Sequence, residues 1–509
     1  MRLPALRLGL PAAPLLAGLL AGLLAAPPAV PAAAAEGRFA PGPCWFTPPD
    51  GEAASCGTLL VPERRDRPSS RLLRLPVAVL RSTAATPAPD PVIYIEGGPG
   101  ASVFGTEEPA EERLESWWEL SAPFRRTRDF VLFDQRGVGR AEPDTNCPEL
   151  DALAAPEPRP APPARRRAAE EAAIRACAQR LQAAGVDMAA FSTPAIADDV
   201  ADLAAALGAP RVNLFAISYG TRVALEVLRR HGGRVRATVL DAVYPPDVNA
   251  REEEAWLSHR ALKRLFDDCT GSRSCRAAFP DLEARFRRLI AKLDETPTEV
   301  AVGDPMVPLT VRLDGRAAVA AVLEAMADGE SLARLPQTVD AATRGRLFRL
   351  ARNAPNPWLG DPDTAEGMAF SIECRETVNA ADPARIAADH RRWSWAAPAT
   401  TSADDPGRRA CSLWPAGARE AIERLPVASP LPVLLLSGAY DPVTPPEWGE
   451  RAAFTLPTSH HMVFRAAGHV VTAGDACALD TAAAFLDTPD PAAVRACRSA
   501  QRPPRFVTQ

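Results

Sequence analysis

The stretch that decides the fold is Val212-Asn213-Leu214-Phe215-Ala216-Ile217-Ser218-Tyr219-Gly220-Thr221-Arg222-Val223-Ala224-Leu225. It begins as an apolar run typical of a buried β-strand. After Ser218 it continues into a run that predicts a helix from Thr221 to His231, ended by Gly232-Gly233. A serine in a tight turn between a strand and a helix holds its hydroxyl clear of the sheet, where it can act as a nucleophile.

The residues beside this serine are small. Ala216 and Gly220 stand two positions before and after Ser218, and their size lets the helix pass close to the strand. The usual pattern has glycine in place of Ala216, so the match is incomplete there. A chance match is the alternative, because similar strings are common in long chains. The rest of the chain decides between the two interpretations.

Length and composition indicate one large domain carrying an insertion, or two domains. The chain has 509 residues, of which 47% are hydrophobic, which is ample for a large core. The formal net charge of -5 does not suggest a nucleic-acid partner. The histidines are too scattered to suggest a metal cluster, and we predict no metal site.

The N-terminus has the pattern of a secretory signal peptide, which we predict over residues 1–35. Arg2 and Arg7 give a positive start, Leu8 to Leu24 is apolar, and Ala33-Ala34-Ala35 offers a cleavage site. An uncleaved membrane anchor is the alternative. No other stretch is long and apolar enough to span a bilayer, so we expect a secreted protein without a membrane partner after cleavage.

The ten cysteines fit an exported protein, because disulfides persist in oxidising compartments. None forms a C-x-x-C pair, and they fall into neighbouring twos along the chain. Free buried thiols are the alternative. Sequence does not fix connectivity, but the order favours pairing Cys44 with Cys56, Cys147 with Cys177, Cys269 with Cys275, Cys374 with Cys411, and Cys477 with Cys497.

Strand and helix patterns alternate along most of the chain, which predicts a mostly parallel sheet. An antiparallel beginning is expected within residues 36–90, and residues 151–170 are expected to form a surface excursion rich in Ala, Pro and Arg. Helical patterns dominate from about residue 246 to 425. We therefore predict a core formed by residues 36–245 and 426–509, with a mainly helical cap over residues 246–425.

A serine nucleophile needs a base, and the base needs an orienting group. Asp441 follows the strand-like run Pro432 to Leu436, and His469 follows the strand-like run Met462 to Phe464. The order serine, acid, histidine is the order of the α/β-hydrolases. Parallel strands would deliver all three side chains to one edge of the sheet. We therefore predict that Ser218, Asp441 and His469 form a catalytic triad.

Each of these assignments has an alternative. Asp441 belongs to an Asp-Pro step, which is common in plain turns. His469 could be a surface-loop histidine, as we expect for His460 and His461. Asp241 is a rival acid, because it also ends a predicted strand. We favour Asp441, since its loop leads towards the strand that delivers His469.

Acyl transfer also needs hydrogen-bond donors for the oxygen that becomes negative. One donor is expected to be the backbone amide of Tyr219, directly after the nucleophile. The second is expected from the turn Gly97-Gly98-Pro99-Gly100, and we favour Gly98, because glycine lets the backbone approach a substrate closely. An ordinary tight turn is the alternative.

Four segments together resemble the secreted tripeptidyl aminopeptidase family, which is related to the prolyl iminopeptidases. They are Glu96-Gly97-Gly98-Pro99-Gly100, Phe133-Asp134-Gln135-Arg136-Gly137, the Ser218 turn, and Ser437 to Pro445. The resemblance runs from about Cys44 to Cys497. It implies an α/β-hydrolase fold, with a mostly parallel sheet and an inserted helical cap, and it implies the triad of Ser218, Asp441 and His469. The sequence departs from the family at Ala216 and at Val470-Val471, where the family often has Gly-Thr or Gly-Val after its histidine.

We predict a secreted serine exopeptidase that releases short N-terminal peptides or residues and needs no cofactor. Its partner would be a peptide substrate with a free N-terminus. An esterase or amidase with the same triad is the alternative, and a non-catalytic binding protein of the same fold is a third possibility. The sequence leaves the oligomeric state and the residue preference open.

An exopeptidase must recognise a charged N-terminus, and a carboxylate lacking its own Arg or Lys would do so. The stretch Met368 to Glu376 has an apolar start and two acids beside Cys374. The family resemblance favours Glu376 over Glu373 as the amine partner. Glu96 is a third candidate. The alternative, weighted equally, is that Glu376 pairs with Arg375 or another arginine of the cap.

Overall fold

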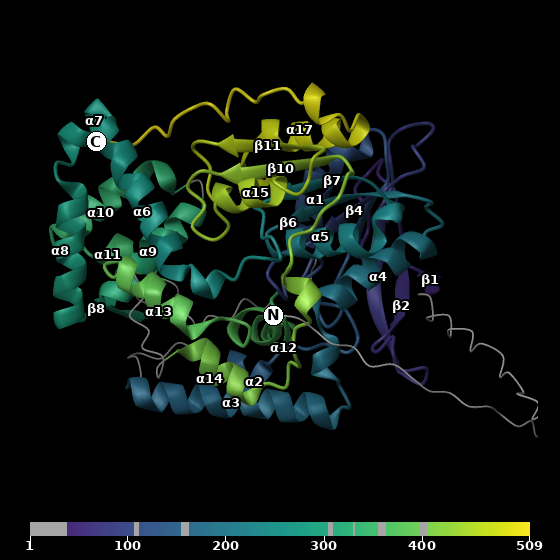
Figure 1. Ribbon diagram of the computed structural model, residues 1–509, viewed down its shortest axis with the longest axis horizontal. Helices are drawn as coiled ribbons and strands as arrows, with labels where there is room; N and C mark the ends of the chain where they lie inside the picture. Colours follow the sequence, from purple (N-terminus) through teal and green to yellow (C-terminus); the bar gives the residue numbers. More distant parts are fainter. Residues whose placement is uncertain are drawn as a thin grey trace, which may run out of the picture. The chain divides into compact units, whose positions relative to one another are not determined.

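The computed structural model describes residues 38–105, 111–153, 162–303, 309–328, 331–354, 363–396 and 405–508. These residues belong to one compact unit, Ala35–Gln509 (Figure 1). The predicted signal peptide lies outside the described residues. Within them, no helix combines the length and apolar character needed to cross a bilayer.

A nine-stranded sheet has the order β1-β2-β3-β5-β4-β6-β7-β10-β11. The pairs from β1 to β5 are antiparallel, and the pairs from β5 to β11 are parallel. The antiparallel beginning and the mostly parallel sheet are therefore confirmed. The strands are β1 (Arg38–Gly42), β2 (Ala54–Pro62), β3 (Leu72–Leu80), β4 (Val92–Ile95), β5 (Phe130–Phe133), β6 (Val212–Ile217), β7 (Val235–Asp241), β10 (Val433–Gly438) and β11 (Ser459–Phe464).

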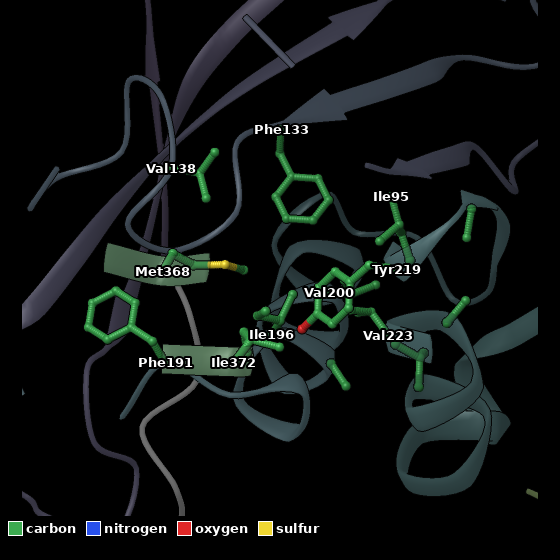
Figure 2. Packing of buried hydrophobic residues seen from close by; sticks show 14 of the residues in the cluster. Ile95, Phe133, Val138, Phe191, Ile196, Val200, Tyr219, Val223, Met368 and Ile372 are labelled. Carbon is green, nitrogen blue, oxygen red and sulfur yellow. The ribbon is translucent and has the colours of Figure 1, made fainter. Parts of the chain in front are cut away.

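The central strands are buried on both faces, because helices cover each side of the sheet. In β4, Ile93 and Ile95 belong to one apolar cluster, whereas Val92 and Tyr94 belong to another. The first cluster contains residues of α4 (Thr193–Ala206) and α5 (Tyr219–His231), several of which Figure 2 shows packed together. The second contains residues of α1 (Glu111–Arg125) and α17 (Ala476–Asp487). Alternate side chains of one strand therefore anchor the helices of opposite faces.

A third apolar cluster holds the helices from α6 (Glu254–Gly271) to α11 (Phe348–Arg352), which lie between β7 and β10 in the chain and which Figure 1 shows grouped beside the sheet. The insertion is not wholly helical, because β8 (Thr298–Ala301) and β9 (Thr310–Leu313) form an antiparallel pair that we did not predict. The helices of the insertion are α6 (Glu254–Gly271), α7 (Arg273–Ala278), α8 (Leu282–Glu295), α9 (Gly315–Ala327), α10 (Leu335–Thr343), α11 (Phe348–Arg352), α12 (Glu366–Ile372), α13 (Pro383–Arg392) and α14 (Pro406–Leu413).

The end of α12 packs differently from the helices before it. Met368 and Ile372 join the cluster of α4 and α5, and a π-helical turn, Glu373–Val378, follows without a break. Cys374 in this turn is bonded to Cys411 of α14. The π-helical turn is therefore fixed between the inserted helices and the helix that follows Ser218. Such turns are frequent at functional sites.

Within the expected surface excursion over residues 151–170, α3 (Pro163–Ala183) begins, and residues 164–166 of this helix are exposed. The abundance of Ala and Arg explains the helix, since both residues favour helices. Residues 154–161 lie outside the described part of the chain. The remaining helices are α2 (Pro148–Asp151), α15 (Pro446–Ala453) and α16 (Val471–Gly474).

All five disulfides pair sequentially, as predicted: Cys44–Cys56, Cys147–Cys177, Cys269–Cys275, Cys374–Cys411 and Cys477–Cys497. We expect the purified protein, denatured without reductant, to expose no titratable thiol. Reduction should lower the melting temperature, because each bridge contributes about 2–4 kcal/mol to the free energy of unfolding. Thiol titration and calorimetry with and without reductant measure both effects. Several free thiols per chain would contradict the pairing.

Candidate active site

Ser218 occupies a sharp turn between the end of β6 and the start of α5. Its φ of 50° is uncommon for a residue other than glycine. The turn is held by a hydrogen bond of 2.9 Å from the Ser218 amide to the Asp241 carbonyl. The Ser218 side chain is half-buried, as is Ile217 before it, whereas residues 212–216 of β6 are buried. The hydroxyl is therefore presented at the carboxyl edge of the sheet.

The residues two positions before and after Ser218 are small because the backbone of β4 lies close to them. A Cβ atom at Gly220 would overlap the carbonyl oxygens of Ile95 and Glu96. Ala216 is fully buried and lies opposite Ile95 in the parallel pairing of β4 and β6. Position 220 therefore requires glycine, whereas position 216 accommodates one methyl group.

The structure brings Ser218, His469 and Asp441 together as one chain of hydrogen bonds. His469 Nε2 lies 2.9 Å from Ser218 Oγ, and His469 Nδ1 lies 2.8 Å from Asp441 Oδ2. The three residues follow β6, β11 and β10, which are parallel. Their side chains consequently meet at one edge of the sheet.

The acid of this chain is buried and rigidly held. Asp441 Oδ1 accepts the amides of Val443 and Thr444 at 2.8 and 2.9 Å, and Oδ2 accepts the Thr444 hydroxyl at 2.8 Å. Sequence reasoning missed Thr444, although a threonine three residues after an aspartate is a turn signal. Burial opposes ionisation of Asp441, but His469 and these donors outweigh it and lower its pKa.

The basicity of the histidine follows from the same contact. Burial alone would lower the pKa of His469, because it disfavours the imidazolium. The charge and hydrogen bond of Asp441 outweigh burial, and the net effect raises the pKa of His469. The arrangement therefore suits a histidine that accepts a proton from Ser218.

Asp241, the rival acid, has a different position. Its carboxylate accepts the Val471 amide at 3.0 Å, and the Thr472 amide and hydroxyl at 2.8 and 2.6 Å. It is fully buried, and burial raises its pKa. Asp241 therefore holds the segment that follows His469, whereas Asp441 contacts the imidazole.

The segment around His469 is strained and is attached to the cap. Val470 has a φ of 58°, which is unusual for a β-branched residue and which glycine would adopt without strain. The His469 amide donates to the carbonyl of Ala327, at the end of α9, at 3.0 Å. The position of the histidine therefore depends on a contact with the inserted helices.

The histidines near it differ from expectation. His460 and His461 lie in β11, half-buried, so the prediction of surface-loop positions is wrong. His461 Nε2 lies 3.0 Å from Ser437 Oγ, and burial lowers the pKa of His461 to about 4. This second serine–histidine pair lacks the sharp turn of Ser218.

The turn at Gly98 lies against the nucleophile. A Cβ at Gly97 would stand 2.9 Å from the Ser218 Cβ, and Gly98 has a φ of 101°, which favours glycine. The Gly97 amide is occupied, because it donates to Glu96 at 2.7 Å. Within the described part of the chain, the Gly98 and Tyr219 amides donate no hydrogen bond. Both predicted donors are thus available to a negative oxygen.

Glu96 supports this turn. Its carboxylate accepts the Gly97 amide and, at 3.1 Å, the hydroxyl of Tyr94. Burial raises the pKa of Glu96. Because both carboxylate oxygens are engaged inside the fold, Glu96 is poorly placed to bind a substrate amine.

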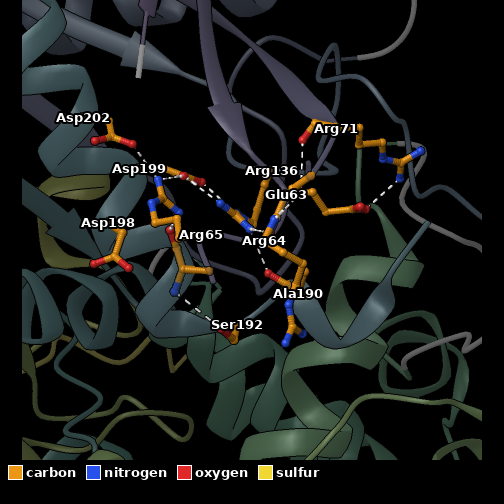
Figure 3. A network of polar contacts seen from close by, with 12 residues as sticks. Glu63, Arg64, Arg65, Arg71, Arg136, Ala190, Ser192, Asp198, Asp199 and Asp202 are labelled. Carbon is orange, nitrogen blue, oxygen red and sulfur yellow. Dashed lines mark hydrogen bonds and ion pairs between the residues drawn. The ribbon is translucent and has the colours of Figure 1, made fainter. Parts of the chain in front are cut away.

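The segment Asp134-Gln135-Arg136-Gly137 also stabilises the turn at Gly98. Gln135 Nε2 donates to the Glu96 carbonyl at 2.8 Å, and Asp134 accepts the Val103 amide at 2.8 Å. Burial raises the pKa of Asp134 to about 6. Arg136 is fully buried and donates to both oxygens of Asp199 of α4, each at 2.7 Å (Figure 3). The segment therefore ties the Gly98 turn to α4.

The two glutamates of the π-helical turn have different surroundings. Glu376 is 2% exposed and faces Arg375 at 3.4 Å and Arg222 at 3.9 Å. The structure therefore favours the arginine-paired alternative for Glu376, and the expectation of an unpaired carboxylate is wrong there. Glu373 is half-buried, and burial raises its pKa against the opposing charge of Arg222.

The chain matches the family model described as the alpha/beta hydrolase fold over residues 90–473. It is 30% identical over 204 residues to a tripeptidyl aminopeptidase of Streptomyces coelicolor, covering 40% of this chain and 36% of that relative. It is 27% identical over 425 residues to carboxylesterase B of Mycobacterium tuberculosis, covering 78% and 77% of the two chains. It is 24% identical over 456 residues to the serine protease Hip1 of Mycobacterium bovis, covering 85% of each chain.

Among solved structures, the chain is similar to a proline iminopeptidase of Mycobacterium smegmatis, with 15% identity and a TM-score of 0.36 over 83% of this chain and 97% of that one. The match to the first curated relatives spans about a third of their own length. The family model, in contrast, extends from just before β4 into α16 and includes Ser218, Asp441 and His469. The chain therefore belongs to the alpha/beta hydrolase fold family.

Proposed function

We propose that this protein is an exported serine exopeptidase that releases short N-terminal peptides or residues through an acyl-enzyme. The observation that carries the proposal is the hydrogen-bonded chain of Ser218, His469 and Asp441 beside two available amides. The relatives named tripeptidyl aminopeptidase and serine protease support a peptide substrate. The five disulfides and the signal-like N-terminus support export.

In this mechanism Ser218 Oγ attacks the carbonyl carbon of the scissile bond while His469 Nε2 takes its proton. Asp441 keeps the proton on Nδ1 and stabilises the imidazolium. The Gly98 and Tyr219 amides donate to the oxygen that becomes negative. His469 then protonates the leaving amine, and a water molecule, deprotonated by His469, releases the N-terminal product from Ser218.

The amine subsite belongs to the same proposal. Glu373 is the candidate that the surroundings favour, because both carboxylate oxygens of Glu376 and of Glu96 already accept hydrogen bonds from the protein. A substrate ammonium would also offset the burial that raises the pKa of Glu373. Glu373 would thereby favour peptides with a free N-terminus.

A substrate panel tests both parts. We expect the wild-type enzyme to cleave p-nitroanilides of one to three residues with a free amine and to disfavour blocked ones. Glu373→Gln should lower kcat/KM on free-amine peptides by about 10- to 100-fold, the value of one charged hydrogen bond, and spare p-nitrophenyl esters. Glu366→Gln is the matched control, since Glu366 on neighbouring α12 accepts the Cys147 amide at 2.9 Å, which a glutamine oxygen can also do.

Two results would count against these assignments. An equal loss on free and blocked substrates would remove Glu373 from the amine subsite. Turnover of esters with none of peptides would favour the esterase alternative, which the carboxylesterase B relative also supports.

The pH dependence provides a further prediction. The base must be neutral, and Asp441 raises the pKa of His469 above its usual value of about 6.5. Activity should therefore be lost as the pH falls through this raised pKa, which places the acid limb of kcat/KM closer to neutrality than for a free histidine. Profiles should be measured on a blocked ester, which has no titrating amine. An acid limb well below pH 6 would contradict the assigned base.

A further inference from the structure

A buried hydrogen-bond chain connects the π-helical turn to the residue after the nucleophile. Glu376 Oε1 accepts the Thr193 amide at 2.9 Å, and Oε2 accepts the Thr193 hydroxyl at 2.8 Å. The same hydroxyl oxygen lies 2.8 Å from the Tyr219 hydroxyl. The three residues are between 2% and 4% exposed. They come from three segments that are distant in sequence.

The direction of the chain follows from the number of protons. A carboxylate only accepts, so the single Thr193 hydroxyl proton points to Glu376. The Tyr219 hydroxyl must then donate to Thr193 Oγ1. Because the donors and acceptors of these hydrogen bonds are fixed, the Tyr219 hydroxyl has one orientation. Each hydrogen bond also polarises the next. The carboxylate charge of Glu376 is thereby linked to the tyrosine ring.

The surroundings make this arrangement rigid. Thr193 is the first residue of α4, and a carboxylate at a helix N-terminus is stabilised by the free amides and the helix dipole. Arg222, in the same first turn of α5 as Tyr219, lies 3.9 Å from Glu376 Oε2. The Tyr219 ring is buried in the cluster that includes Ile196 and Val200 of α4 (Figure 2). Glu376 is therefore attached to the first turn of α5 at two points.

We propose that Glu376 and Thr193 are positioning residues that hold Tyr219, and with it the amide beside Ser218, in place for the negative oxygen. This inference rests on the proposed function, because it gives the Tyr219 amide its role there. The inserted segment thus influences the transition state through Tyr219, the residue after the nucleophile. In this role Glu376 does not touch the substrate amine. Loss of the hydrogen bonds between Glu376, Thr193 and Tyr219 should lower kcat while leaving substrate affinity nearly unchanged.

The test uses isosteric variants of the full-length protein. Thr193→Val and Tyr219→Phe should each lower kcat by about 10- to 100-fold, the effect of a small misplacement, on peptides and esters alike. KM should stay within about twofold. Thr193→Ser keeps the hydroxyl and should restore most of kcat. The double variant should be no slower than the slower single variant, because both remove the same chain.

Thr238→Val is the matched control. Thr238 is fully buried in β7, and its hydroxyl has no partner among the described residues, so its loss should change neither kcat nor melting temperature. A folded Thr193→Val enzyme with unchanged kcat would overturn the inference. A loss confined to KM for free-amine peptides would also overturn it and would return Glu376 to the amine subsite. Wild-type enzyme that cleaves only esters would contradict the exopeptidase proposal, while the positioning effect would still be measured on the ester.

Discussion

Replacing Ser218 by alanine is expected to lower kcat by about 10⁶-fold on every substrate, because its hydroxyl is the group that forms the acyl-enzyme. The fold should be unaffected. Among the described residues, the Ser218 hydroxyl contacts only His469, and the backbone bond to Asp241 remains in the variant. Removal of one half-buried hydroxyl changes the free energy of unfolding by about 0.5 kcal/mol or less. Steady-state kinetics and thermal melts of the same preparation measure both effects.

Ser437→Ala provides an internal control for this result. Ser437 also lies 3.0 Å from a histidine, His461, but it is fully buried within β10. Within the described part of the chain, no carboxylate contacts that histidine, whose pKa is lowered to about 4 by burial. We expect Ser437→Ala to keep its activity. Substantial turnover by Ser218→Ala, or its loss in Ser437→Ala, would place the nucleophile elsewhere.

The parts of the fold that the sequence predicted are those in which local pattern and tertiary environment agree. The strand before Ser218 is apolar except for Asn213, as burial on both faces of a parallel sheet requires. Gly220 marks a close backbone contact that permits no side chain. Ser218, Asp441 and His469 meet because the parallel strands before them end at one edge of the sheet.

Other features depend on contacts that no local pattern records. Asp241 and Asp441 both follow apolar strand runs, and only the fold shows that one binds amides after His469 and the other the imidazole. Besides its arginine neighbours, Glu376 binds Thr193, which is 183 residues away. A carboxylate that stabilises a distant helix N-terminus looks, in sequence, the same as one that awaits a substrate. The sequence therefore could not show whether Glu376 binds the N-terminus of α4 or a substrate amine.

Exchanging Asp441 for asparagine should be the second most damaging change to the site. The variant keeps the size of the side chain but removes the acceptor that holds the proton on His469 Nδ1, so the imidazole is stabilised in the wrong tautomer. We expect kcat to fall by about 10⁴-fold. The two backbone amides that Asp441 Oδ1 accepts can still be satisfied by an amide oxygen, so the fold should survive. Kinetics at a temperature well below the melting transition isolate the chemical effect.

Asp241→Asn is the matched variant, because both acids are fully buried at the carboxyl edge of the sheet. Asp241 accepts three hydrogen bonds from Val471 and Thr472, and an asparagine amide would face some of these donors with its own. The expected cost is therefore in stability, about 1–3 kcal/mol, with a much smaller loss of kcat than in Asp441→Asn. Activity that survives Asp441→Asn but disappears in folded Asp241→Asn would reverse the two roles. It would also mean that the 2.8 Å contact between His469 and Asp441 does not orient the base.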